Sequence, residues 1–127
     1  MTGPNVFNSI TLILALGAGL FVGPGLTGQA NADANLFAQQ CGVCHTLNAQ
    51  DAPRQGPTLD ALFGRKAGAV ENFPYSNSLK SLNLSWNTEN LDQWMIRPQD
   101  MAEDSYMMYS QKDAVVRAAI IQFLKSQ

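Results

Sequence analysis

The chain has 127 residues, a length that fits one domain. Its formal net charge of −2 lacks the basic surplus that nucleic-acid binding requires, so we expect no nucleic-acid partner. Two cysteines and one histidine are too few for a structural zinc site with four ligands. The sequence also contains no evident catalytic triad, phosphate-binding loop or paired acid and base, and we do not expect an enzyme.

An apolar run near the start, residues 10–22, is followed by small residues at 30–32. The run is too short to cross a bilayer, and it predicts a signal peptide at residues 1–32 that is cleaved to leave one domain at residues 33–127. No Lys or Arg precedes Arg54, whereas a signal peptide usually begins with basic residues. An uncleaved segment that associates loosely with a membrane is therefore the alternative.

The segment from Asp33 to Gln40 predicts the first helix. Its apolar residues Leu36 and Phe37 suit one helix face, and Asn31 or Asp33 can cap the first turn. If the helix continues, positions 41, 44 and 45 share a face, because residues three and four apart are neighbours on a helix.

These positions hold Cys41, Cys44 and His45, which are all the cysteine and histidine of the chain. Two thiols at this spacing can add to the two vinyl groups of a haem, and the adjacent imidazole can bind the iron, so C-x-x-C-H is typical of c-type haem attachment. A redox dithiol would need a βαβ context, and no strand pattern lies nearby. We therefore expect one covalent haem with iron. Because such thiols meet haem outside the cytoplasm, we expect export to a periplasm or an equivalent space.

Two loops and a short helix are predicted next. Residues 48–55 are polar and predict a loop. The apolar residues of segment 59–63 have helical spacing and predict a short helix that ends at Gly64. Residues 68–84 show no sustained period and predict a second loop.

Two further helices are predicted in the last third of the chain. One runs from about Asn87 to Arg97 and ends at Pro98, and residues 99–111 then predict a loop rich in methionine and acidic side chains. The other begins after Asp113, a favourable N-cap. Its apolar stripe consists of Val116, Ile120, Phe123 and Leu124, with Arg117 and Lys125 off the stripe.

No segment shows the clean alternation of a strand, so the fold class is all-α. The few helices alone bury too little surface for a comfortably stable small domain. A covalent haem would give the loops an apolar surface to pack against. We expect about three to five helices wrapped with long loops around one haem.

Several segments together resemble the class I c-type cytochromes, in particular the mitochondrial cytochrome c and bacterial cytochrome c2 group. The resemblance covers nearly all of residues 36–125 and implies the class I cytochrome c fold. The matching segments are Cys41-Gly-Val-Cys-His45-Thr, Gly56-Pro57-Thr-Leu59-Asp-Ala-Leu-Phe-Gly-Arg65-Lys-Ala-Gly68, Tyr75-Ser76, Trp86 and the predicted helix that ends at Pro98.

The resemblance implies a role for each matching residue. Cys41 and Cys44 would form the thioethers, His45 would be the proximal iron ligand, and the carbonyl of Pro57 would accept the histidine Nδ1 proton. The residues implied to hydrogen-bond a haem propionate are Arg65, Tyr75 and Trp86. Trp94 would lie beside the bond between iron and methionine, or would be an ordinary core residue.

The sixth ligand implied by the resemblance is Met107, counted from Pro98 without gaps, with Met108 and then Met101 as alternatives. Just before it the family typically has proline-glycine, whereas this chain has Glu103-Asp104. The loop geometry is therefore expected to differ from that of the family.

A haem iron with two protein ligands has no open site and suits electron transfer. The resemblance implies an electron carrier between redox partners such as a respiratory or photosynthetic donor and an oxidase or reaction centre. Together with the predicted export, this leads us to expect a monomeric periplasmic protein without a stable membrane span in the mature chain. The acids Asp100, Glu103 and Asp104 favour a partner whose docking surface is basic or apolar. The alternatives are a dedicated subunit of a periplasmic sulfur- or alcohol-oxidising complex and a haem sensor domain.

Overall fold

A computed structural model describes residues 26–127. Most of the predicted signal peptide, residues 1–25, lies outside the described residues, and its cleavage stays a prediction. The elements are the helices α1 (Leu26–Gln40), α2 (Asn77–Ser81), α3 (Thr88–Ile96) and α4 (Ala114–Lys125), with a 3₁₀ turn η1 (Pro98–Asp100) after α3. The expected all-α class is confirmed, since residues 26–127 contain only one isolated antiparallel bridge, between Lys66 and Ser85.

The helix α1 begins at Leu26, earlier than the predicted start at Asp33. Asn31 and Asp33 therefore lie inside the helix and do not cap it. Alanine and glutamine, which favour helix, recur through this segment and no proline interrupts it. Within the described part of the chain, no helix is both long and apolar enough to cross a membrane.

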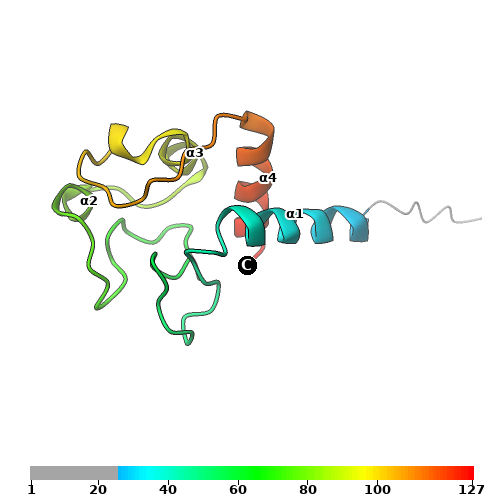
Figure 1. Cartoon of the computed structure of the whole chain (residues 1–127), viewed down its shortest axis with the longest axis horizontal. Helices are drawn as coiled ribbons and strands as arrows, with labels where there is room; N and C mark the ends of the chain where they lie inside the picture. Colours follow the sequence, from blue (N-terminus) through cyan, green and yellow to red (C-terminus); the bar gives the residue numbers. More distant parts are fainter. Residues whose placement is uncertain (1–25) are drawn as a thin grey trace, which may run out of the picture.

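Two helix pairs form the core, because α4 packs against both α1 and α3. Figure 1 shows α1 and α4 crossing, with α2, α3 and the connecting segments gathered to one side of the crossing. The rings of Phe37 and Phe123 meet at this crossing with their centroids 5.1 Å apart. Ile120 of α4 is completely buried, as its place on the predicted stripe indicated.

The ends of α3 and α4 are fixed by side-chain caps. Asn87 accepts a hydrogen bond from the backbone N–H of Asn90, and the Asn90 side chain accepts one from the backbone of Asn87, which is a capping box. Asp113 accepts from the N–H groups of Val115 and Val116. The predicted helices in these two segments and the Asp113 cap are therefore confirmed.

The expectation that Arg117 lies off the buried stripe of α4 is wrong, because Arg117 is itself buried, together with Ile120, Ile121 and Leu124. Its guanidinium donates to both carboxylate oxygens of Asp92, at 2.7 and 3.3 Å. It also donates to the carbonyls of Gln111 and Lys112 at 3.1 and 3.0 Å. Burial of this charge is possible because α3 supplies a carboxylate and the chain before α4 supplies carbonyls.

The predicted short helix at residues 59–63 is also wrong, since these residues form turns. Ala61 has φ of 45°, which interrupts any right-handed helix. The backbone N–H of Leu59 donates to Thr46 and that of Gly64 to Trp86, so the segment bonds to distant parts of the chain. Conversely, the predicted loop 68–84 contains α2.

Candidate functional site

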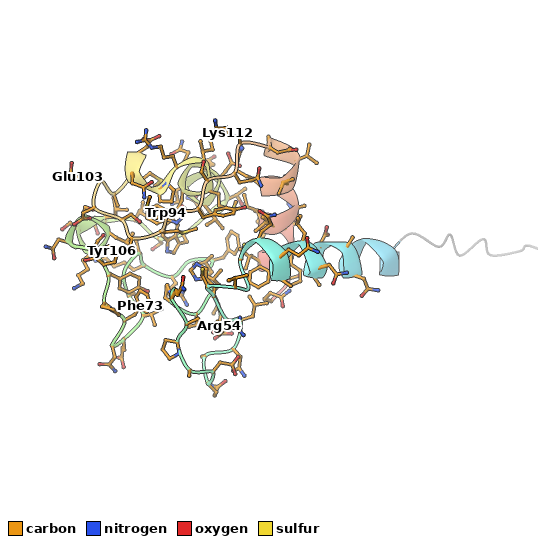
Figure 2. The ribbon with its side chains drawn as sticks, in the orientation of Figure 1. Arg54, Phe73, Trp94, Glu103, Tyr106 and Lys112 are labelled. Carbon is orange, nitrogen blue, oxygen red and sulfur yellow. The ribbon has the colours of Figure 1, made fainter. Side chains whose placement is uncertain are left out.

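A cavity of about 370 Å³ lies between the helices and the long connecting segments. Figure 2 labels Phe73, Trp94 and Tyr106, three of the side chains that line it. Much of its wall is apolar, from leucines of four segments together with Met95 and Ile120. The structure brings all the sequence-predicted site residues to this one cavity: Cys41, Cys44, His45, Pro57, Arg65, Tyr75, Trp86 and Met107.

The C-x-x-C-H segment forms a turn directly after α1, not the continuation of the helix that the spacing suggested. The N–H groups of Cys41 and Gly42 both donate to the Phe37 carbonyl, which ends the regular helix. The N–H groups of Cys44 and His45 then both donate to the Cys41 carbonyl, at 3.0 and 2.9 Å. This turn still brings both cysteines and the histidine to the same cavity.

Both cysteines are free and half-buried. Burial, followed by the neighbouring Cys44, raises the pKa of Cys41 to about 11. The Cys44 Sγ lies 3.4 Å from Oε1 of Gln55 at the rim of the cavity. Two free thiols, three positions apart in the sequence, thus line the same cavity, as attachment to the two vinyl groups of a haem requires.

The imidazole of His45 is oriented by the backbone. Its Nδ1 lies 2.8 Å from the carbonyl oxygen of Pro57 and must donate, because a carbonyl can only accept. Burial lowers the pKa of His45, against the opposing effect of the Pro57 hydrogen bond. The ring is therefore neutral at pH 7, and its Nε2 keeps a lone pair for a metal.

Gly56 is a site residue that the sequence reasoning did not single out. A Cβ at this position would meet Nδ1 of His45 at 2.6 Å and Nε2 at 2.8 Å, closer than real Cβ contacts. Its N–H also donates to the Cys44 carbonyl at 2.8 Å. The signal available in the sequence was its place directly before Pro57.

The sulfur of Met107 is held by an indole. Nε1–H of Trp94 donates to Sδ of Met107 at 3.2 Å, and both residues line the cavity. Trp94 in turn packs edge-on against Trp86, with ring centroids 5.4 Å apart and an interplanar angle of 66°. Trp94 therefore has two roles together, that of a core aromatic and that of a partner of the methionine sulfur.

The two alternative methionines are placed differently. Met108 also borders the cavity, but it is 83% exposed, and Met101 does not line the cavity. The Nε2 group of Gln99 donates to the carbonyls of Ser105 and Met107, at 3.2 and 2.9 Å. Gln99 thus supports the backbone around Met107, a role that nothing in the sequence indicated.

A second glutamine joins α1 to the same segment. Oε1 of Gln40 accepts from the hydroxyl of Tyr109 at 3.1 Å and from the side chain of Gln111 at 3.4 Å. Burial raises the pKa of Tyr109, so its hydroxyl stays a donor at neutral pH. Gln40 directly precedes Cys41, and this contact therefore links the thiol-bearing turn to the methionine-bearing segment.

Arg65 and Tyr75 form the polar part of the wall. The guanidinium of Arg65 donates to the carbonyls of Asp60 at 2.6 Å and Thr58 at 2.7 Å. Burial lowers the pKa of Arg65, while Tyr75 and Asp60 oppose this, and burial raises the pKa of Tyr75. A guanidinium has five N–H donors, more than two carbonyls need, so Arg65 suits an additional anionic partner at the cavity.

Two of the three acids expected to face a partner are engaged within the chain. Asp104 accepts hydrogen bonds from the backbone N–H groups of Asn77 and Ser78. Asp100 pairs with Arg97 at 3.3 Å, and both side chains are exposed. The expected basic or apolar partner surface stays a prediction.

The donor set of this cavity fits a c-type haem. It offers two thiols, an imidazole nitrogen with a free lone pair, a thioether and an apolar wall with an arginine at its edge. These are the groups that covalent attachment, axial ligation of iron and contact with propionates need.

Comparison with known proteins agrees with this geometry. The family model of Cytochrome c matches residues 30–127. The chain is 34% identical over 101 residues to cytochrome c of Cochliobolus lunatus, covering 79% of this chain and 94% of the relative. It is 33% identical over 103 residues to cytochrome c of Arabidopsis thaliana, covering 80% and 92%. The chain therefore belongs to the cytochrome c family, whose members are electron carriers with one covalent haem c.

Proposed function

We propose that this chain is an exported, periplasmic single-haem electron carrier in which His45 and Met107 are the axial ligands of the iron. The observation that carries the ligand assignment is the contact of 3.2 Å between Nε1 of Trp94 and Sδ of Met107, in the cavity that also holds His45. A haem bound there supplies an iron that exchanges one electron. The side chains of the cavity determine which atoms hold the iron and whether a substrate can bind to it.

Cys41 and Cys44 would attach the group by thioether bonds, which removes both ionisable thiols from the cavity. His45 would bind through Nε2, because Nδ1 donates to the Pro57 carbonyl. That hydrogen bond fixes the ring and increases the basicity of the coordinating nitrogen. Arg65 and Tyr75 would neutralise propionate charge at the cavity wall.

Met107 is a better candidate than Met108 for the second axial ligand. Its sulfur lies beside a buried indole and its carbonyl is held by Gln99, whereas Met108 is largely exposed to solvent. Thioether sulfur favours the reduced iron and raises the potential. With His45 and Met107 both bound to it, the iron would have no position left for a substrate and would supply electron transfer alone.

The ligand assignment is tested by the optical spectrum of the oxidised protein, made with haem-attachment machinery. We expect a weak long-wavelength band from the bond between iron and sulfur. The band disappears in Met107→Ala and persists in Met108→Ala. Loss in Met108→Ala alone would overturn the assignment, and carbon monoxide binding to the reduced wild-type protein at neutral pH would indicate a sensor.

The compartment is tested with the full chain. Fractionation of the host that expresses it, with N-terminal sequencing of the haem-bearing product, is expected to give periplasmic protein that begins near residue 33. Holoprotein retained in the cytoplasmic fraction would contradict export. Stoichiometric co-purification with a larger redox protein would contradict a diffusible carrier.

A further inference from the structure

The segment that bears Met107 lacks the residues that usually fix a loop by their backbone alone. Residues 99–111 contain neither proline nor glycine. Their conformation must therefore be set by hydrogen bonds and packing rather than by a restricted or permissive φ. Three side chains between residues 99 and 106 hydrogen-bond to the backbone, and two of them, Gln99 and Ser105, act on the backbone next to Met107.

The third is Asp104, whose carboxylate reaches across to the start of α2. Oδ2 accepts the N–H of Asn77 at 3.1 Å and Oδ1 accepts the N–H of Ser78 at 3.2 Å. The hydroxyl of Ser78 donates to Oδ1 as well. Both carboxylate oxygens are thus used, although the side chain is exposed. We name these interactions the Asp104–α2 contact.

The Asp104–α2 contact joins two segments that are far apart in the sequence. Both segments line the cavity, one through Ser76 and Leu79 and the other through Ser105 and Met107. The contact therefore ties together two parts of the cavity wall, one of which bears the methionine. A merely solvated acid would have no such effect.

Ser105 links the Asp104–α2 contact to Met107. The N–H of buried Ser105 donates to the Ala102 carbonyl at 2.9 Å, and Oγ of Ser105 accepts the N–H of Met107 at 3.3 Å. Only two residues, Ser105 and Tyr106, lie between Asp104 and Met107, and hydrogen bonds at each end of this stretch restrict it. If Asp104 is released from α2, the bonds of Gln99 and Ser105 to the backbone of Met107 remain, but the segment loses its hydrogen bonds to α2.

We propose that Asp104 is a positioning residue for Met107, which keeps the thioether on the iron by fastening the methionine-bearing segment to α2. The inference rests on the proposed ligation by His45 and Met107. Asp104 itself touches neither the iron nor the haem in this scheme. Its loss is expected to make the methionine easier to displace without removing the haem.

The test measures displacement of the thioether by an added ligand. Oxidised holoprotein is titrated with imidazole, and loss of the long-wavelength band gives an apparent affinity. We expect Asp104→Ala to bind imidazole about two- to tenfold more tightly than wild type, since several hydrogen bonds are lost, with Asp104→Asn in between. Circular dichroism of each holoprotein checks that the helices remain.

The matched control is Glu103→Ala, which removes the same charge from the neighbouring exposed position. It is expected to leave the imidazole affinity unchanged, and equal shifts in both variants would overturn the proposal in favour of a charge effect. Ser78→Ala is expected to shift the affinity in the same direction as Asp104→Asn. Added to Asp104→Ala, it is expected to cause little further change, because the shared contact is already gone.

Two failures can be told apart. If wild-type protein shows no long-wavelength band, the proposed methionine ligation is wrong and the role of Asp104 falls with it. If wild type shows the band but Asp104→Ala and Asp104→Asn bind imidazole as wild type does, the ligation stands and the role of Asp104 alone is overturned.

Discussion

Gly56 lies against the ring of His45, so closely that a Cβ on Gly56 would meet Nδ1 at 2.6 Å and Nε2 at 2.8 Å. Both residues are held in place, Gly56 by its hydrogen bond to Cys44 and His45 by its hydrogen bond to Pro57. Gly56 cannot shift without breaking its hydrogen bond to Cys44, and the His45 ring cannot shift without breaking the hydrogen bond to Pro57 that orients it. The glycine therefore determines where the ring is placed.

This relationship predicts the behaviour of Gly56→Ala. The added methyl must push the ring away from Pro57, so we expect a lower yield of holoprotein and an altered haem absorption spectrum. Gly64→Ala is the control, because a Cβ there meets nothing within 4 Å although φ is 81°. It is expected to cost about 1 kcal/mol in denaturant unfolding and to leave the haem spectrum unchanged. A normal spectrum and yield for Gly56→Ala would contradict the prediction.

Removal of the indole donor is predicted to change the potential. Trp94→Phe keeps an aromatic ring but loses the hydrogen bond to Met107, which makes the sulfur a stronger donor to oxidised iron. A bond worth about 0.5–1.5 kcal/mol corresponds to a potential lower by roughly 20–60 mV, measurable by protein-film voltammetry. Met108→Leu, which changes the neighbouring exposed thioether, is expected to leave the potential unaltered. A higher potential in Trp94→Phe would refute this account of the contact.

Stability is predicted to depend steeply on Ile120. It is completely buried where α4 meets the cavity and the other helices, so Ile120→Ala is expected to lower the free energy of unfolding by about 2–5 kcal/mol. Val115 lies on the same helix and is 78% exposed. Val115→Ala is expected to change the same quantity by less than about 0.5 kcal/mol in a chemical denaturation experiment. Equal effects of the two substitutions would show that α4 is not packed in this orientation.

The cap of α4 predicts a smaller loss. Asp113 accepts two backbone N–H groups of the first turn, and Asp113→Ala leaves them without this partner. The expected loss is about 0.5–2 kcal/mol in the free energy of unfolding. Lys112→Ala, one position earlier, serves as the matched substitution, because the contact of Lys112 with Arg117 uses the backbone carbonyl and survives the change. A loss of similar size in both variants would argue against the cap.

The dependence of stability on pH is predicted from Asp104. Hydrogen bonds from Ser78, then Ser76, hold the pKa of Asp104 below the ordinary aspartate value of 3.8. Folding thus favours the ionised form of Asp104. Its contribution to stability is present at pH values above the ordinary pKa and is lost as the pH falls through the lowered pKa. The difference in melting temperature between wild type and Asp104→Asn is expected to be constant near neutral pH and to shrink at acid pH below 3.8. The melting temperatures are measured by calorimetry on reduced holoprotein. A difference between wild type and Asp104→Asn that grows on acidification would contradict this sign.

The features predicted correctly from the sequence are those that neighbouring residues decide. The cap at Asp113 and the stripe with Ile120 depend on positions within one or two turns, so spacing and residue type suffice. The C-x-x-C-H spacing carries its chemistry in five consecutive residues. These local signals were enough to indicate α1, α3, α4 and the cofactor.

The wrong expectations concern residues whose partners are distant. Segment 59–63 bonds to Thr46 and Trp86 instead of forming a helix, and Arg117 is buried because Asp92 lies on another helix. Gly56 and Gln99 act on His45 and Met107 through backbone positions that no periodicity reveals. Such contacts exist only once the chain has enclosed the cavity, and a pattern of single residues does not encode them.

The single oxygen of Gln40 has a mechanical consequence. Through it, the residue before the first thiol is bound to two residues just after Met107. These two hydrogen bonds therefore couple the end of α1 to the segment after Met107. Slow amide hydrogen exchange is expected to have the same rate at α1 and at residues 109–111 in the wild-type protein. In Gln40→Ala the two segments are expected to exchange at different rates.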